Sequence, residues 1–350
     1  MNAKLPNPDS NAVALDFRNF GVLPDELRAD WTRGFLRVKK LLPPPPRKAI
    51  IELVNTCNYD CPMCRVGQFG VNLHRCLPYS DFSRILQQLT GVTVVRLNGL
   101  GESTLLPNFL NYVEEIIRLD KRIELITNGS GSLAQYETIL AAQGKILISW
   151  DAALPELFEK LRRPAKWSES IEKARQVACT RERLSSKSTL ALLFTLQSAN
   201  IRELSPLVQL CKDIGFDEVV VNVVKQKTEW VTRFYSSIVA EIEIARRIAQ
   251  DVGVHLRFPN HIAGHQIDVS GAASTSSTHC TAPWDEVLIR WNGDVQVCNM
   301  FNPYTYGNIF LTSFEEIWSG YFATLFRDKI NTKNRHPYCV GCVYFQEAYE

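Results

Sequence analysis

The sequence lacks any uninterrupted run of about eighteen apolar residues, the length that a transmembrane helix requires. Its first residues, MNAKLPNPDSNAVALDF, also lack the apolar core of a secretory signal. The charges nearly cancel, because 39 basic and 37 acidic residues give a formal net charge of +2. Without a basic excess, extensive binding of phosphates is not expected. We therefore expect a soluble, cytoplasmic protein that binds neither a membrane nor a nucleic acid.

Cysteine, in contrast, is abundant, with ten residues in a chain of 350. In a reducing compartment, clustered cysteines bind metals or take part in chemistry more often than they form disulfides. The remaining composition, 45% hydrophobic and 22% charged, is ordinary for a globular protein. The length is sufficient for one large core and a smaller module. The spacing of the cysteines is therefore the feature that discriminates between functions.

A run of four prolines, Pro43 to Pro46, separates an N-terminal segment (1–47) from the rest of the chain. From Lys48 onward, apolar strand-like segments alternate with helical ones. Strands are predicted at 48–54, 93–98, 122–127, 145–150, 189–196 and 218–224, and helices near 80–90, 107–119, 132–143, 167–181 and 201–214. This alternation predicts an α/β fold with a parallel sheet, a partial (β/α)6-type barrel over residues 48–270.

A second, smaller domain is predicted at residues 271–350. It begins with a polar stretch of small residues, 271–278, which is typical of a linker. Two short apolar segments then flank Asn292-Gly293, a strong signal for a β-hairpin. A helix near 313–330 follows, so we expect an α+β module.

The first cysteine cluster comprises Cys57, Cys61 and Cys64, spaced C-x3-C-x2-C directly after the first strand. Three thiolates suit a [4Fe–4S] cluster with one open iron, whereas a structural zinc ion usually has four protein ligands. The alternative is a zinc site that borrows His74 or Cys76 as its fourth ligand. The spacing alone favours the iron–sulfur cluster.

This spacing, at this place in a βα series, resembles the radical S-adenosylmethionine (SAM) superfamily, in which the open iron chelates the amino and carboxylate groups of SAM. The segment Gly99-Leu100-Gly101-Glu102 is similar to the Gly-Gly-Glu segment of that family, which receives the SAM amino group. Leu100 stands where the family has its first glycine. The resemblance therefore implies SAM contacts for Gly99, Gly101 and Glu102.

Further positions that resemble SAM contacts follow the third and fourth strands. Thr127 and Asn128 look like positions that contact the ribose, and Ser149 and Asp151 look like positions that contact the carboxylate. Met63 matches the hydrophobic residue that the family places beside the adenine. Most of these positions lie at the carboxyl ends of parallel strands, the side where α/β barrels bind ligands.

The second cysteine cluster comprises Cys280, Cys298, Cys339 and Cys342, a complete ligand set for an iron–sulfur cluster or for zinc. Downstream of a radical SAM core, this pattern resembles the SPASM/twitch extension, which carries auxiliary [4Fe–4S] clusters. Only eight residues follow Cys342, and none of them is cysteine. The shorter twitch form, with one auxiliary cluster, is therefore expected. Four cysteines would saturate this cluster, which favours electron transfer, whereas zinc would be structural.

The resemblance implies an enzyme that cleaves SAM reductively to a 5′-deoxyadenosyl radical, which abstracts hydrogen from the substrate. It also implies a one-electron donor such as flavodoxin or ferredoxin. We expect an oxidoreductase that dehydrogenates a small molecule such as a sugar or cyclitol. The alternatives are a maturase acting on a ribosomal peptide, a redox-neutral epimerase or decarboxylase, and, in another class, a non-catalytic iron–sulfur or zinc protein.

Overall fold

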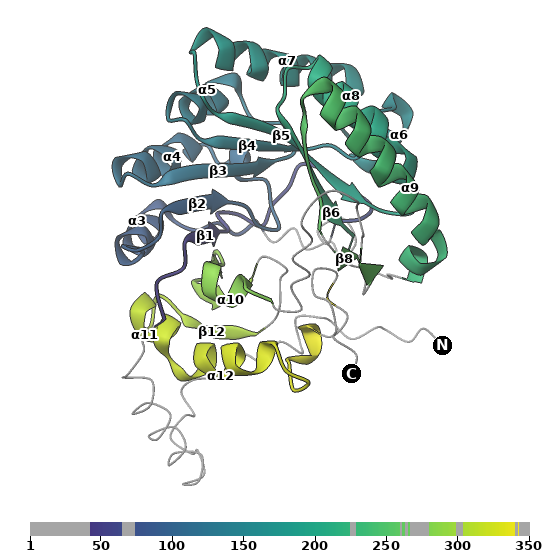
Figure 1. Ribbon diagram of the computed structural model, residues 1–350. Coiled ribbons are helices and arrows are strands. Elements are labelled where there is room, and N and C mark those ends of the chain that lie inside the picture. Colours follow the sequence, from purple (N-terminus) through teal and green to yellow (C-terminus); the bar gives the residue numbers. More distant parts are fainter. Residues whose placement is uncertain are drawn as a thin grey trace, which may run out of the picture.

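A parallel sheet forms the centre of the computed structural model, which describes residues 43–64, 74–224, 229–259, 261–262, 265–266, 280–298, 304–339 and 342. In this part of the chain the largest sheet has ten strands, in the order β12-β11-β10-β1-β2-β3-β4-β5-β6-β7. Figure 1 shows the strands as an arc with helices on its outer side. The sheet is open, because β12 and β7 are edge strands.

Seven consecutive strands, all parallel to their neighbours, build the barrel part of the sheet. They are β1 (Lys48–Ile51), β2 (Val94–Leu97), β3 (Arg122–Thr127), β4 (Lys145–Ser149), β5 (Thr189–Leu196), β6 (Glu218–Val223) and β7 (His255–Arg257). The central strands are largely buried, as near-continuous apolar segments of a covered parallel sheet should be. The prediction of a partial α/β barrel is confirmed.

Helices connect the strands and cover the outer face of the sheet. They are α3 (Tyr79–Gln88), α4 (Phe109–Arg118), α5 (Leu133–Ala141), α6 (Pro155–Leu161), α7 (Trp167–Arg183), α8 (Leu204–Asp213) and α9 (Glu229–Val252). The sequence reading missed the short helix α6, which is only two turns long. None of the helices among the described residues combines the length and apolarity needed to cross a membrane.

Paired charges lie within the barrel near the amino ends of the strands. The Lys48 ammonium is 2.9 Å, and the Arg96 guanidinium 2.7 Å, from the same carboxylate oxygen of Glu124. Burial by itself would raise the pKa of Glu124, but these two cations outweigh it and lower that pKa to about 2. A second such pair joins Lys145 to Glu218. The buried charges at this end of the barrel are therefore compensated.

The C-terminal strands continue the sheet beyond β1. The strand β10 (Glu286–Ile289) pairs in parallel with β1 and antiparallel with β11 (Asp294–Gln296). Gly293 has a φ of 86° in the turn between them, which confirms the predicted hairpin. A third strand, β12 (Thr305–Asn308), was not predicted. Its sequence, TYGN, contains glycine and asparagine, which are uncommon in strands.

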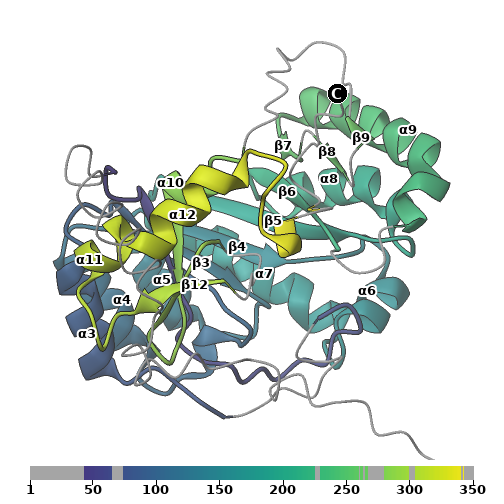
Figure 2. The same cartoon turned by 90° about the horizontal axis from the view of Figure 1, so that it is seen from below.

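The helix predicted at 313–330 is wrong as a single element. The structure has two helices there, α11 (Phe314–Ser319) and α12 (Tyr321–Ile330), separated by Gly320. A Cβ at Gly320 would lie 2.5 Å from the Glu316 carbonyl oxygen, so the chain can turn this sharply only at glycine. Figure 2 shows both helices at the edge of the module that also contains β12. The predicted linker at 271–278 lies outside the described residues.

The proline run packs against the C-terminal module. The Trp318 indole of α11 donates a hydrogen bond to the Pro44 carbonyl oxygen over 2.9 Å. Arg47 pairs with Asp285, the last residue of the short helix α10 (Ala282–Asp285), over 3.1 Å. The chain that enters β1 is therefore held by residues near its C-terminal end.

Candidate active site

The first cysteine cluster occupies the loop that follows β1. Cys61 is buried, and Cys57 and Cys64 are half-buried. Burial raises the pKa of the Cys61 thiol to about 11, and the neighbouring thiols Cys64 and Cys57 raise it further. Burial also raises the pKa of Cys57, whose sulfur accepts a hydrogen bond from the Tyr59 N–H over 3.4 Å. Binding of a cationic metal centre would offset the cost of ionising Cys57 and Cys61.

Neither cysteine cluster has its side chains gathered around one point in the part of the chain that the structure describes. Within the described residues, no three Cys, His, Asp or Glu side chains converge closely enough to hold a single ion. The His74 ring lies 3.5 Å from the Thr56 hydroxyl, and Cys76 forms an isolated β-bridge with Val54. The [4Fe–4S] cluster, in which each thiolate binds its own iron, and the zinc site with a fourth ligand both stay predictions.

The segment after β2 packs directly against the cysteine loop. The Gly101 N–H donates to the Val54 carbonyl over 3.1 Å, and the Glu102 N–H donates to the Thr56 carbonyl over 2.9 Å. A Cβ at Gly101 would lie 2.4 Å from that Val54 oxygen. A Cβ at Gly99 would lie 2.3 Å from the Glu52 side chain. Glycine at both positions is therefore required by contact between two loops.

The Glu102 carboxylate joins the ends of β2 and β3. It is 3% exposed and accepts hydrogen bonds from the hydroxyls of Thr104 (2.6 Å) and Thr127 (2.9 Å) and from the Asn128 N–H (2.6 Å). Burial raises its pKa, although these donors oppose the shift. The structure thus brings together Glu102, Thr127 and Asn128, which the sequence placed on separate strands. Since protein donors occupy this carboxylate, its expected contact with the SAM amino group stays a prediction.

Asn128 connects the end of β3 to the cysteine loop. Its side-chain amide donates to the Asn58 side-chain oxygen over 2.9 Å and lies 3.8 Å from the Cys57 sulfur. Its own side-chain oxygen accepts from the Ser130 N–H over 2.9 Å. A residue predicted to contact SAM is therefore adjacent to a predicted cluster ligand. This juxtaposition is what a site shared by a cluster and SAM requires.

Asp151, two residues after β4 ends, is bound by protein groups. Its carboxylate is fully buried, accepts from the Thr195 N–H over 2.7 Å and pairs with Arg162 over 2.5 Å. Its expected contact with SAM stays a prediction. Arg162, which sequence reasoning missed, interacts electrostatically with Cys61 and Cys64. Asp151 orients the Arg162 guanidinium toward the cysteine loop. The only signal for Arg162 in the sequence was Asp151 itself, because an aspartate that becomes buried needs a partner.

Two other residues, Ser149 and Met63, were predicted to contact SAM. Ser149 ends β4 and is half-buried, and Met63 is half-buried in the cysteine loop. Both stay predictions as SAM contacts.

Gln197, just after β5, has a buried amide nitrogen without a hydrogen-bond partner in the described part of the chain. Because a buried donor of this kind calls for an acceptor, Gln197 is a further candidate for ligand contact.

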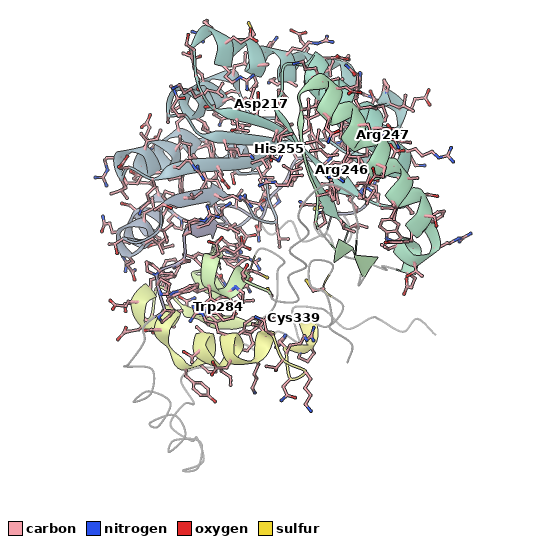
Figure 3. The ribbon with its side chains drawn as sticks, in the orientation of Figure 1. Asp217, Arg246, Arg247, His255, Trp284 and Cys339 are labelled. Carbon is pink, nitrogen blue, oxygen red and sulfur yellow. The ribbon has the colours of Figure 1, made fainter. Side chains whose placement is uncertain are left out.

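The second cysteine cluster lies in the C-terminal module. Figure 3 shows Cys339 there, below the arc of the sheet. The Cys342 N–H donates to the Cys339 carbonyl over 3.4 Å. Burial raises the pKa of Cys280 to about 11, with a further contribution from Cys342. Asn331 at the end of α12 holds Cys280 by hydrogen bonds to its N–H (2.7 Å) and its carbonyl (3.2 Å). Cys298 packs against the same core as Cys280 and Cys339.

A buried ion pair joins this module to the segment after β2. Glu52 has no exposed surface, and one of its carboxylate oxygens accepts from the Arg290 guanidinium directly after β10. The other oxygen accepts from the Leu100 N–H over 2.9 Å. Sequence reasoning missed both charged residues. A glutamate inside the apolar run Ile50-Ile51-Glu52-Leu53-Val54 was the available signal, because a buried carboxylate needs a partner.

Comparison with known sequences agrees with these features. A family model described as SPASM, an iron–sulfur cluster-binding domain, matches residues 280–343. The chain is 22% identical over 322 residues to a protein of Pyrococcus furiosus named tungsten-containing aldehyde ferredoxin oxidoreductase cofactor-modifying protein, with 83% of this chain and 86% of the relative covered. It is also 26% identical over 210 residues to a probable GTP 3′,8-cyclase of Methanocaldococcus jannaschii, covering 57% of this chain and 67% of that one.

Similar folds occur among solved structures. Streptococcus suis SuiB has a TM-score of 0.65 and 18% identity, with 91% of this chain and 80% of SuiB covered. The enzyme anSMEcpe, solved with bound AdoMet and a peptide, has a TM-score of 0.62 and 15% identity, with 85% of this chain and 86% of that one covered. The chain therefore shares the fold of these solved structures. Its residues 280–343 form a SPASM domain, which is an iron–sulfur cluster-binding domain.

Proposed function

We propose that this chain is a radical SAM enzyme that carries out a two-electron oxidation of an alcohol-bearing small molecule such as a sugar or cyclitol. The substrate would lose one hydrogen atom to the radical derived from SAM, then one electron to the auxiliary cluster and one proton to water. Cys57, Cys61 and Cys64 would bind the first cluster. The auxiliary cluster would be bound by Cys280, Cys298, Cys339 and Cys342.

One observation carries this proposal, namely the complete set of four thiols in the SPASM module. An auxiliary cluster with four cysteine ligands has no open iron for a substrate, so its remaining use is to accept or donate electrons. An electron acceptor near the substrate favours net oxidation over a redox-neutral reaction. The buried setting of Cys280 supports this use, since exclusion of water is one means of setting a cluster's potential.

The residues of the barrel have separate tasks in this scheme. When bound, the first cluster and SAM supply the radical that removes hydrogen from the substrate. The backbone of residues 99–102 is held against the cysteine loop and would present its peptide groups to SAM. Asn128 would maintain the distance between that loop and β3. Arg162, oriented by Asp151, would offset the negative charge of the thiolates.

A peptide substrate is the second candidate. The solved structures with similar folds include SuiB bound to the precursor peptide SuiA, with a TM-score of 0.61, and anSMEcpe bound to a peptide. These structures support a peptide substrate by similarity of fold alone, because their sequence identity to this chain is only 18% and 15%. The named activity of the P. furiosus relative, modification of a cofactor, points instead toward a small molecule.

The test begins with metal content. Protein reconstituted anaerobically should contain about eight irons, and the Cys57/Cys61/Cys64→Ala variant about four. Only the wild-type protein should form 5′-deoxyadenosine from SAM and dithionite. Cys179→Ala is the matched control, because this thiol is exposed on α7 and belongs to neither cluster. Zinc in place of iron, or no SAM cleavage by fully loaded wild type, would refute the proposal.

The substrate class is decided by deuterium transfer. Candidate sugars and cyclitols deuterated at carbinol carbons, and deuterated peptides, would be incubated with enzyme, SAM and reductant. Deuterium in 5′-deoxyadenosine, together with a product two mass units lighter than the unlabelled substrate, identifies an oxidised substrate. Transfer from peptides only would replace the small-molecule proposal with the peptide one. Transfer without loss of two hydrogens would indicate redox-neutral chemistry.

A further inference from the structure

Tyr306, in β12, has a buried hydroxyl without a partner. The side chain belongs to a residue that is 3% exposed, and its hydroxyl forms no hydrogen bond within the part of the chain that the structure describes. A buried hydroxyl that is left unpaired loses its hydrogen bonds to water without replacement, which destabilises the fold. Buried polar groups in native proteins are almost always paired, so the absent partner calls for an explanation.

The ring of Tyr306 is held by its neighbours. Trp318 and Phe326 contact it edge-on, with centroid distances of 6.3 and 6.1 Å, and Tyr304 does so at 6.1 Å. The guanidinium of Arg327 lies 5.8 Å from the centroid of the Tyr306 ring and 4.0 Å from that of Trp318. The side chain of Arg327 is itself fixed by hydrogen bonds to two backbone carbonyls. The phenol therefore cannot swing out to solvent without dismantling this cluster.

The hydroxyl lies in the electrostatic field of the second cysteine cluster. Burial raises the pKa of Tyr306, and the thiols of Cys298 and Cys280 both raise it further. The sheet topology also relates Tyr306 to Cys298. The strand β12, which contains Tyr306, pairs with β11, and Cys298 lies two residues after Gln296, the last residue of β11. The unpartnered hydroxyl and two of the thiols that are proposed to bind the auxiliary cluster therefore belong to the same module and interact electrostatically.

We propose that the Tyr306 hydroxyl donates a hydrogen bond to the auxiliary cluster, at a sulfide or at a thiolate of Cys280 or Cys298, and thereby raises its reduction potential. The inference rests on the proposed ligand set. A hydrogen bond to sulfur stabilises the more negative, reduced cluster, so removing the donor disfavours reduction. Tyr306 is thus a positioning and tuning residue that makes the cluster a better acceptor for the electron lost by the substrate.

The test compares Tyr306→Phe with a matched control, Tyr304→Phe. Tyr304 lies two residues earlier, and its hydroxyl donates to the Phe322 carbonyl over 3.0 Å. Both changes would be made in the Cys57/Cys61/Cys64→Ala background, so that only the auxiliary cluster is titrated by electron paramagnetic resonance. Tyr306→Phe should lower the reduced-to-oxidised ratio about tenfold at fixed potential, which is about 59 mV for one electron. Tyr304→Phe should change it much less.

Stability provides a second readout. In the metal-free protein, Tyr306→Phe removes an unpaired hydroxyl and should leave the melting temperature unchanged or higher. In the cluster-loaded protein it removes a hydrogen bond and should lower the melting temperature. An unchanged potential in Tyr306→Phe, or the same shift in both tyrosine variants, would overturn the inference while leaving the proposed function intact. A triple-alanine background that binds no iron would instead refute the proposed ligand set.

Discussion

The ion pair between Glu52 and Arg290 offers a quantitative test of how the SPASM module is attached to the barrel. The two residues are 238 positions apart in the chain, and Glu52 is fully buried while the Arg290 side chain is 19% exposed. Arg290→Met keeps much of the side-chain volume but leaves the carboxylate without its cation. Removing one partner of a buried pair costs about 3–5 kcal/mol. We expect the free energy of unfolding to fall by that amount.

The same variant should weaken SAM binding. Glu52 also accepts a hydrogen bond from the Leu100 N–H. Without its cation the buried carboxylate will move, and this movement will disturb the segment after β2. A loss of about 1.4 kcal/mol would weaken the affinity tenfold. Calorimetry with SAM on the cluster-loaded protein measures this loss, and urea unfolding measures the stability.

A matched control lies on the surface. Arg47 and Asp285 are also 238 residues apart and connect the same two parts of the chain, but their side chains are 51% and 46% exposed. Arg47→Met should therefore cost at most about 1 kcal/mol and leave SAM affinity unchanged. Adding Glu52→Gln, which still accepts from Leu100, completes a double-mutant cycle with Arg290→Met. A coupling energy below about 0.5 kcal/mol, or equal costs for the two arginine variants, would refute the reasoning.

Two further predictions concern the barrel. Gly101→Ala places a Cβ 2.4 Å from the Val54 carbonyl oxygen, so it should destabilise the protein by about 1–3 kcal/mol and weaken SAM binding; wild-type affinity by calorimetry would contradict this. The pKa of Glu124 is about 2, because Arg96 and Lys48 outweigh burial. A lowered pKa stabilises the fold above pH about 4.5, and this contribution is lost as the pH falls toward 2. Glu124→Gln should therefore cost up to about 3 kcal/mol at pH 7 and flatten the acid dependence of urea unfolding; parallel acid profiles would argue against it.

The sequence by itself determined the order of the main strands and helices of the barrel and the positions of the cysteines. The predicted strands at 122–127 and 189–196 agree with β3 and β5 at both ends. Hydrophobic periodicity and glycine signals are local, so they can be read without knowing the fold. The spacing of Cys57, Cys61 and Cys64 was informative for the same reason, since a short loop limits where its thiols can point.

Tertiary structure alone decided which charged groups pair with one another. The pairing of Asp151 with Arg162 could not be read from the sequence. The pairing of Glu52 with Arg290 depends on β10 lying beside β1, a contact between distant segments that no local pattern encodes. Burial makes such pairing obligatory, because a charge removed from water must find a partner. Local propensity therefore specified the elements, whereas desolvation within the assembled fold specified the partners of their polar side chains.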